Sequence, residues 1–341
     1  MAGTPSFYKT SLKDIEEQLA EVKKGEVSKI GFSAGGRPIY AVSYGEKEPI
    51  EHIANLSSAL AAGQPEAFFG KEERKKQVML IISAAHGGEM ESIAATLNLI
   101  SIMERGVDLK GNSWPKIKKL AEKMRIVIVP CLNVDGRARI PSNDPKTWTD
   151  YEREKYRHGL YPDGSPIGWP QCKVPHPRDP KQHAFLGGYF NDKGVNPIHG
   201  VFLPEEIAPE THIALKLALD ETPDLVLDLH SCGAGPFFIV GNSSLPESFN
   251  RRQYYLDGFC RRMLSERLNI HRPWTVKGKE RVITLDSAFY HVCGALPMLF
   301  EGSDGAHPRY PYSHEQIVDA YLTVIEGLIT VGVKEGFKPS I

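Results

Sequence analysis

The sequence predicts an α/β fold in which a mixed or largely parallel sheet is covered by helices on both faces. Four short apolar runs have the length of strands that are buried on both faces. Amphipathic stretches with helical periodicity lie between these runs. Strands that alternate with helices are typical of such a covered sheet. The composition agrees with a globular protein, because 41 % of the 341 residues are hydrophobic and 24 % are charged.

The expected elements are taken in chain order. A charged amphipathic helix is expected over residues 11–24. The stretches 29–33 and 38–43 then flank Gly35-Gly36, which predicts a hairpin near a sheet edge. Buried strands are predicted at 78–83, 125–130, 224–229 and 236–241, and helices at 90–105, 209–220, 251–268 and 317–331. Ser313 and Gln316 have the spacing of a capping box before the last helix.

Residues 141–203 differ from the rest of the chain. They are rich in Pro, Gly, Asp, Lys and Tyr and have no clear periodicity. Irregular segments of this length in a compact domain are usually functional or disordered. Two interpretations stay open: insertions that help to wall a cleft, or a surface insertion without a role. We expect residues 1–341 to form one domain that carries this insertion-rich segment.

The bulk properties argue against several classes of partner. A formal net charge of −1 lacks the basic excess typical of nucleic-acid-binding proteins. No apolar run reaches the length expected for a membrane span, and the first eight residues lack the features of a signal peptide. A cytoplasmic protein without a membrane partner is therefore expected. The five scattered cysteines fit neither a disulfide framework nor a cysteine-based zinc site. The oligomeric state stays unknown.

The first candidate metal ligands follow the predicted strand 78–83. His86 lies three residues before Glu89, at the start of a predicted helix. A strand end followed by a helix start places both side chains at the carboxyl edge of the sheet, where open α/β sheets bind ligands. Neutral imidazole and carboxylate groups are suitable Zn²⁺ ligands, and Gly87-Gly88 permits a tight turn. Alone, this motif is weak evidence for a metal site.

A second buried strand, at 224–229, ends at His230. Two strands that deliver histidines to the same sheet edge can share one metal ion. A His-Glu-His set leaves a zinc position open for water, which is the catalytic arrangement. Taken by itself, His230 is more often a hydrogen-bonded histidine at a strand end.

A third apolar run leads into Glu301. A carboxylate in this position is costly unless it is solvated, paired or functional. If Glu301 faces the metal, it can accept a proton from water and pass it to the leaving nitrogen. The alternative is a glutamate held in a salt bridge at a strand end.

In this order, the motifs resemble those of the M14 family of zinc metallocarboxypeptidases. The matching segments are Gly36-Arg37-Pro38-Ile39, His86-x-x-Glu89, Asn133-Val-Asp-Gly136, Pro209-Glu-Thr211, Asp228-Leu-His230-Ser231 and Leu299-Phe-Glu301-Gly302. The resemblance implies a twisted, mixed sheet of about eight strands between helices. It also implies one Zn²⁺ per chain, bound by His86, Glu89 and His230, and a water activated by the metal and Glu301.

The resemblance further implies an arginine that stabilises the oxyanion. The permanent charge and rigid donor fork of arginine suit this role. Arg137 and Arg139, just after Asn133-Val-Asp-Gly136, are the candidates, and Arg139 is preferred.

The chain departs from the family pattern where the terminal carboxylate of the substrate binds. Ile198 and His199 stand where an Asn-Arg pair is expected, so His199 is only a partial replacement. Asn196 stands where an aspartate usually orients the first zinc histidine. Either another arginine, such as Arg178 or Arg281, supplies the clamp, or the substrate is not an ordinary C-terminal peptide.

A tyrosine that caps the substrate is also expected before the catalytic glutamate. Residues 274–285 contain none, and Tyr290 is the nearest candidate.

Three hypotheses follow for function. The first is a zinc carboxypeptidase acting on peptides or peptide-like substrates. The second is a zinc amidohydrolase or deacylase acting on a small N-acyl or modified amino acid, which the altered clamp and the long insertion favour. The third is a non-catalytic binding protein, which has no need for Glu301.

Overall fold

The computed structural model describes residues 4–72, 74–141, 144–174, 176–199, 201, 207–271, 276–277, 283–307 and 311–339. Eight strands in these ranges form one mixed sheet in the order β1-β2-β4-β3-β7-β10-β8-β9. They are β1 (Glu26–Phe32), β2 (Pro38–Tyr44), β3 (Val78–Ser83), β4 (Arg125–Val129), β7 (Leu225–Cys232), β8 (Phe237–Val240), β9 (Val276–Lys277) and β10 (Leu296–Ser303). The predicted α/β fold with a mixed, eight-stranded sheet is confirmed.

Strand direction gives the sheet two chemically different edges. The central strands β4, β3, β7 and β10 are parallel to one another. The pairs β1-β2, β2-β4 and β10-β8 are antiparallel, and β9 is parallel to β8. The ends of β3, β7 and β10 therefore meet at one side of the sheet, here called the carboxyl edge. Their starts meet about 20 Å away at the amino edge, since a strand rises about 3.3 Å per residue.

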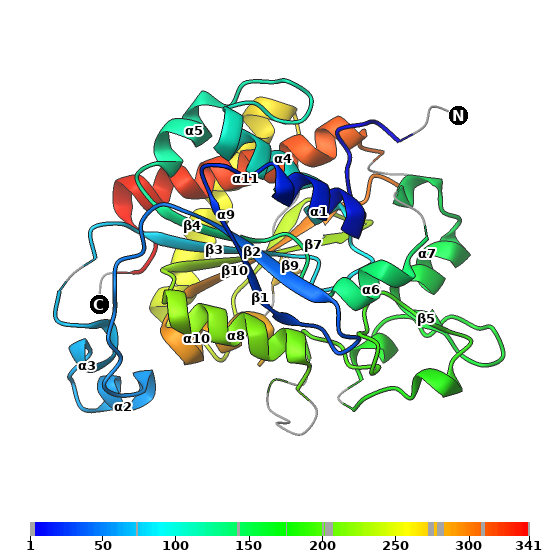
Figure 1. The fold of residues 1–341 in the computed structure, drawn as a ribbon, viewed down its shortest axis with the longest axis horizontal. Coiled ribbons are helices and arrows are strands. Elements are labelled where there is room, and N and C mark those ends of the chain that lie inside the picture. Colours follow the sequence, from blue (N-terminus) through cyan, green and yellow to red (C-terminus); the bar gives the residue numbers. More distant parts are fainter. Residues whose placement is uncertain are drawn as a thin grey trace.

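Helices cover both faces of the sheet, as Figure 1 shows. One face carries α1 (Leu12–Ala20), α4 (Glu91–Arg105), α5 (Pro115–Ala121), α9 (Glu247–Leu268) and α11 (His314–Glu335). The other face carries α8 (Pro209–Glu221) and α10 (Leu285–Cys293), with the short helices α2 (Leu56–Ala61) and α3 (Glu66–Phe69) beyond them. Every residue of β3 and β4 is buried, which explains their continuous apolar sequences.

The last helix, α11, begins as its sequence predicts. Ser313 and Gln316 form a reciprocal capping box at its start. By length and composition alone α11 could cross a membrane, but 83 % of its most apolar window is buried inside the protein. Its apolar character is explained by packing against α4 and α9.

Residues 141–203 contain more regular structure than their sequence predicts. They include η1 (Pro145–Thr147), α7 (Asp150–Arg157), η2 (Gln171–Lys173), η3 (Pro180–Gln182) and a small sheet of β5 (Gly159–Leu160) and β6 (Phe185–Leu186). A capping box between Thr149 and Glu152 starts α7. The segment has its own apolar cluster, which includes Ile167, Cys172 and Phe190. These elements are too short to leave a periodic pattern.

Candidate active site

The loop after β3 positions the first two candidate ligands. Ala84 adopts a positive φ of 50°, and the chain then passes through His86-Gly87-Gly88-Glu89 into α4. The loop packs so closely that a Cβ atom on Gly87 would lie 2.2 Å from the backbone nitrogen of Arg137. The loop therefore requires glycine at this position for close approach.

Glu89 lies between two imidazole rings. Its Oε1 atom is 3.0 Å from His86 Nδ1, and its Oε2 atom is 2.8 Å from His230 Nδ1. All three residues are only 2 % exposed. The sheet brings His230 here because β7 and β3 are parallel neighbours that end at the same edge. The structure thus brings the three predicted metal ligands together.

The outer nitrogen of each imidazole faces a second layer of polar groups. His86 Nε2 donates to Asn196 Oδ1 over 3.3 Å, and His230 Nε2 lies 3.0 Å from Asp228 Oδ2. These contacts direct both Nδ1 atoms toward Glu89 and fix the ring orientations. Asn196 therefore occupies the place predicted for it, beside the first histidine.

The donor set fits a Zn²⁺ ion. A lone pair on an imidazole nitrogen and a carboxylate oxygen repel each other at these distances unless a proton or a cation lies between them. Burial lowers the pKa of His86 to about 3, so this ring is neutral at pH 7 and can bind a metal. Burial opposes the charge on Glu89, but His86 and His230 outweigh it and hold the pKa of this carboxyl well below its ordinary value.

Glu301 joins the same edge from the third strand. The parallel register of β10 with β7 places Glu301 directly opposite His230. Unlike the three candidate ligands, Glu301 is partly exposed. A partly exposed carboxylate beside the buried His-Glu-His cluster is suitably placed to exchange a proton with a substrate.

Comparisons with known proteins agree with this geometry. A family model described as zinc carboxypeptidase matches residues 12–259. The chain belongs to this family. No curated protein matches the sequence.

Solved structures share the fold at low sequence identity. A metallo-carboxypeptidase from Burkholderia cenocepacia is 16 % identical with a TM-score of 0.56, over 94 % of this chain and 68 % of that one. One from Pseudomonas aeruginosa, in complex with (2-guanidinoethylmercapto)succinic acid, is 16 % identical with a TM-score of 0.55, over 93 % and 66 %. Bovine thrombin-activatable fibrinolysis inhibitor is 14 % identical with a TM-score of 0.55, over 97 % and 99 %.

This member of the zinc carboxypeptidase family covers its first histidine with a tyrosine that the sequence did not reveal. The ring of Tyr189 stacks on His86, with centroids 3.7 Å apart and planes only 7° from parallel. Lys173 Nζ lies 4.7 Å from the centroid of Tyr189, and its charge helps to lower the pKa of His86 after the larger effect of burial. Both residues belong to the 141–203 segment, so this segment contributes a wall of the site.

The positions of Arg137 and Arg139 argue against the oxyanion role predicted for them. Arg137 donates from Nε to the carbonyl of Thr10 and from Nη1 to that of Ile140. Arg139 donates to Asp192 and to three backbone carbonyls, of Leu186, Gly187 and Phe190. These bonds hold neighbouring segments together, so both guanidinium groups serve packing.

A third arginine, Arg157, packs against the loop His86-Gly87-Gly88-Glu89. It is buried, with Nη1 3.3 Å from Asp304 Oδ2 and Nη2 3.8 Å from Glu91 Oε1. Although burial opposes its charge, Asp304 and Glu91 raise the pKa of Arg157. The Cγ atom of Arg157 lies 3.5 Å from the position that a Cβ atom would take if Gly88 had a side chain. Arg157 therefore supports the loop from behind.

The remaining substrate-binding predictions have mixed outcomes. His199 lies in the same turn as Asn196, and its backbone nitrogen donates to the carbonyl of that residue. Arg178 contacts the ring faces of Tyr161 and Phe190 within the 141–203 segment. Arg281 lies outside the described residues.

The prediction for Tyr290 is wrong. This tyrosine packs against Phe249 and lines a pocket with Asp224 at the amino edge. Because α10 leads into the start of β10, residues near the end of this helix lie far from Glu301, which is near the end of β10.

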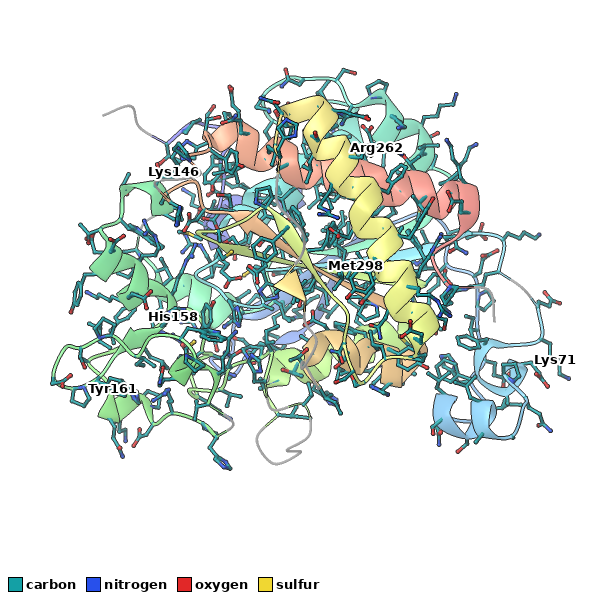
Figure 2. The ribbon with its side chains drawn as sticks, turned by 180° about the vertical axis from the view of Figure 1, so that it is seen from behind. Lys71, Lys146, His158, Tyr161, Arg262 and Met298 are labelled. Carbon is teal, nitrogen blue, oxygen red and sulfur yellow. The ribbon has the colours of Figure 1, made fainter. Side chains whose placement is uncertain are left out.

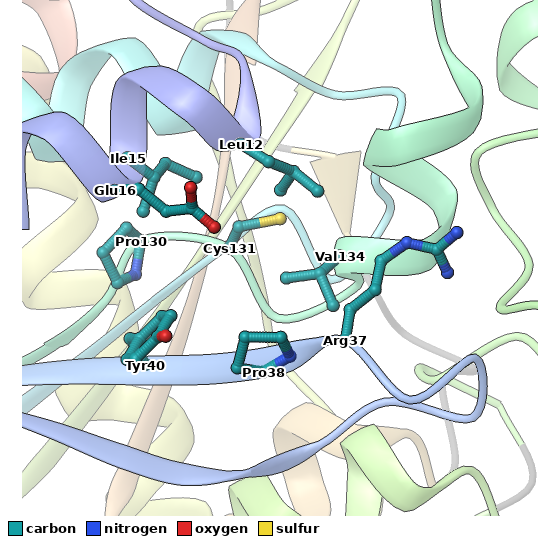
Figure 3. A pocket seen from close by; sticks show the side chains of 9 residues that line it. All are labelled: Leu12, Ile15, Glu16, Arg37, Pro38, Tyr40, Pro130, Cys131 and Val134. Carbon is teal, nitrogen blue, oxygen red and sulfur yellow. The ribbon is translucent and has the colours of Figure 1, made fainter.

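The pocket in Figure 3 is separate from the His-Glu-His cluster, none of whose residues lines it. It lies between α1 and β2, has a volume of about 90 Å³ and includes Arg37 and Cys131. Burial raises the pKa of Cys131 to about 12, which makes the thiol unreactive. This volume is small compared with ordinary ligand sites. All five cysteines of the chain are unpaired.

Proposed function

We propose that the protein is a carboxypeptidase that binds one Zn²⁺ ion through His86, Glu89 and His230 and hydrolyses a peptide or peptide-like amide. The observation that carries this proposal is the buried His-Glu-His cluster with Glu301 in register beside it. When bound, the zinc supplies Lewis acidity toward water and the scissile carbonyl. The chain's own residues supply orientation and proton transfer.

In this proposal Glu301 acts as the proton carrier. Its carboxylate accepts a proton from the attacking water and later donates it to the leaving nitrogen. Asn196 and Asp228 keep the two imidazole rings in orientation through their outer nitrogens. These roles together amount to hydrolysis of an amide without a covalent enzyme intermediate.

Lys173 is the cation that we propose for the negative charge of the substrate. It is partly exposed, and it lies over Tyr189 next to the metal cluster. Arg157 is buried and lies between the carboxylates of Asp304 and Glu91. The turn at Asn196 helps to place Lys173, because Asn196 Nδ2 donates to the carbonyl of Cys172. A lysine can thus stand in for the missing arginine clamp as a point charge.

A second candidate function is hydrolysis of a small N-acyl or modified amino acid. It is favoured by Ile198, which is 1 % exposed and cannot bind a carboxylate. The two functions differ in whether a free carboxylate next to the scissile bond is required.

Paired N-acylated dipeptides with free and amidated C-termini test this difference. If the protein is a carboxypeptidase, it should cleave the free acid faster than the amide. This preference should decrease in Lys173→Met and should be retained in Lys181→Met, a control at an exposed lysine. Equal cleavage of acid and amide overturns the carboxypeptidase proposal and supports the alternative. A protein that contains no stoichiometric metal and cleaves neither substrate overturns both.

A further inference from the structure

A large pocket opens at the amino edge, far from the metal cluster. Its volume is about 590 Å³, within the range of sites that bind small molecules. The pocket is bounded by α2, the segment before β3, the start of α9, the end of α10 and the chain after α11. In Figure 2, Lys71 at its rim and His158 beside Tyr189 lie on opposite sides of the molecule.

Apolar side chains form much of the pocket wall. They are Leu56, Leu60, Phe69, Phe249 and Tyr290. Phe249 and Tyr290 pack edge to face, with ring centroids 4.7 Å apart. Leu60 is 43 % exposed, so its apolar side chain is accessible to a ligand. The wall thus offers aromatic and aliphatic surface to a ligand.

Two basic groups meet one carboxylate at the inner end of the pocket. Arg74 Nη2 lies 2.9 Å from Asp224 Oδ1, and Lys338 Nζ lies 3.5 Å from the same oxygen. The other oxygen of Asp224 accepts the backbone N–H of Val78. Lys338 Nζ also lies 4.3 Å above the ring of Phe69, at the border between the charged end and the apolar wall.

The charges at this inner end are unequal. Among the described residues that line the pocket, Lys71 and Glu72 offset each other at the rim, which leaves two cations against the single carboxylate of Asp224. Burial lowers the pKa of Lys338, although the nearby Asp224 acts to raise it. An anion is therefore electrostatically favoured here.

We propose that this pocket binds a small carboxylate with an apolar or aromatic body. The carboxylate group would lie beside Arg74 and Lys338, since a guanidinium fork and an ammonium both suit this anion. The body would lie against Leu60, Phe69 and Tyr290. The site is independent of the proposed zinc chemistry, because His230 is six residues further along β7 than Asp224.

Calorimetric titration of the full chain with 3-phenylpropanoate and with its neutral amide tests the charge requirement. The acid is expected to bind about tenfold more tightly, because only the acid can make charge-assisted contacts with Arg74 and Lys338. Lys338→Met keeps most of the apolar stem and should weaken binding of the acid about tenfold, while the exposed-lysine control Lys75→Met should bind like the parent protein.

A steric variant tests the location. Leu60→Trp fills the pocket without removing a charge and should abolish binding, whereas His86→Ala, which disrupts the metal cluster, should leave it intact. Thermal melts confirm that each variant is folded. Equal affinity for acid and amide overturns the proposal. The proposal is also overturned if both Lys338→Met and Leu60→Trp bind the acid like the parent protein. Loss of binding in His86→Ala alone overturns it too, because the acid would then bind at the His-Glu-His cluster.

Discussion

The two ends of β3, β7 and β10 hold charged groups in opposite ways. At the carboxyl edge, His86, Glu89 and His230 are 2 % exposed and contact one another directly. At the amino edge, the side chains of Arg74 and Lys338 are 12 % and 26 % exposed and open onto a large pocket. The same three strands thus end in a closed cluster and begin in an open one.

This difference follows from what each cluster lacks. The closed cluster contains two imidazoles and a carboxylate, a donor set that a cation such as Zn²⁺ completes. The open cluster contains two cations and one carboxylate, an arrangement completed by an anion. Buried charges are costly unless they are paired. The charged groups at the carboxyl edge and at the amino edge therefore indicate a positive ligand at the first and a negative ligand at the second. Changes at either end test whether the two are independent.

The largest effect is expected from removing a metal ligand. His230→Ala should reduce stoichiometric zinc to background and abolish hydrolysis, because two ligands bind Zn²⁺ much more weakly than three. Added zinc should raise the melting temperature of the parent protein but not of the variant. The exposed histidine of α8 provides the control His212→Ala. Zinc retained at full occupancy in His230→Ala would contradict the assignment.

The next effect concerns the proton carrier. Glu301→Gln keeps the shape of the side chain but cannot accept a proton, so kcat should fall about 10²- to 10⁴-fold. Zinc content should not change, since Glu301 is not a ligand in this assignment. Steady-state kinetics with metal analysis measure both, and the exposed α9 residue provides the control Glu266→Gln. A variant that loses its zinc would instead identify Glu301 as a ligand.

The metal end was more predictable from sequence than its surroundings. Apolar runs that each end in His or Glu lie on parallel strands, so strand direction alone brings His86, His230 and Glu301 to one edge. Tyr189 and Lys173 could not be found this way. Their positions depend on the folding of the 141–203 segment, whose short elements leave no periodic signal.

Predictions that relied on proximity along the chain placed three side chains wrongly, those of Arg137, Arg139 and Tyr290. Arg137 and Arg139 lie in the short helix α6 (Val134–Arg139), where neighbouring carbonyls take up their donors. Tyr290 is close to Glu301 in sequence, but Tyr290 lies near the end of α10 and Glu301 near the end of β10, which places them at opposite edges. Short separations predict neighbours within one element and fail where the chain reverses.

A smaller effect is expected from the second layer of the metal end. Asp228→Asn removes the charge behind His230 while keeping the size of the side chain, so zinc affinity should fall about 10- to 100-fold. Saturating zinc should restore most of the activity, which separates this positioning role from proton transfer. Competition with a chelator of known affinity measures the change. Unaltered zinc affinity would show that Asp228 does not orient the histidine.

The smallest effect on zinc binding is expected from a change at the amino edge. Asp224→Asn is the most direct test of whether the two edges are independent. The substitution leaves Arg74 and Lys338 without their carboxylate and weakens the bond to the start of β3. Urea unfolding should show a loss of about 1–3 kcal/mol, the usual cost of leaving a buried charged group without its partner. Zinc affinity should stay unchanged, because His230 lies about 20 Å away along β7.

The same variant should also bind 3-phenylpropanoate more tightly, because both cations then become available to the ligand. A fall in zinc affinity would mean that the two ends are coupled through the three strands they share.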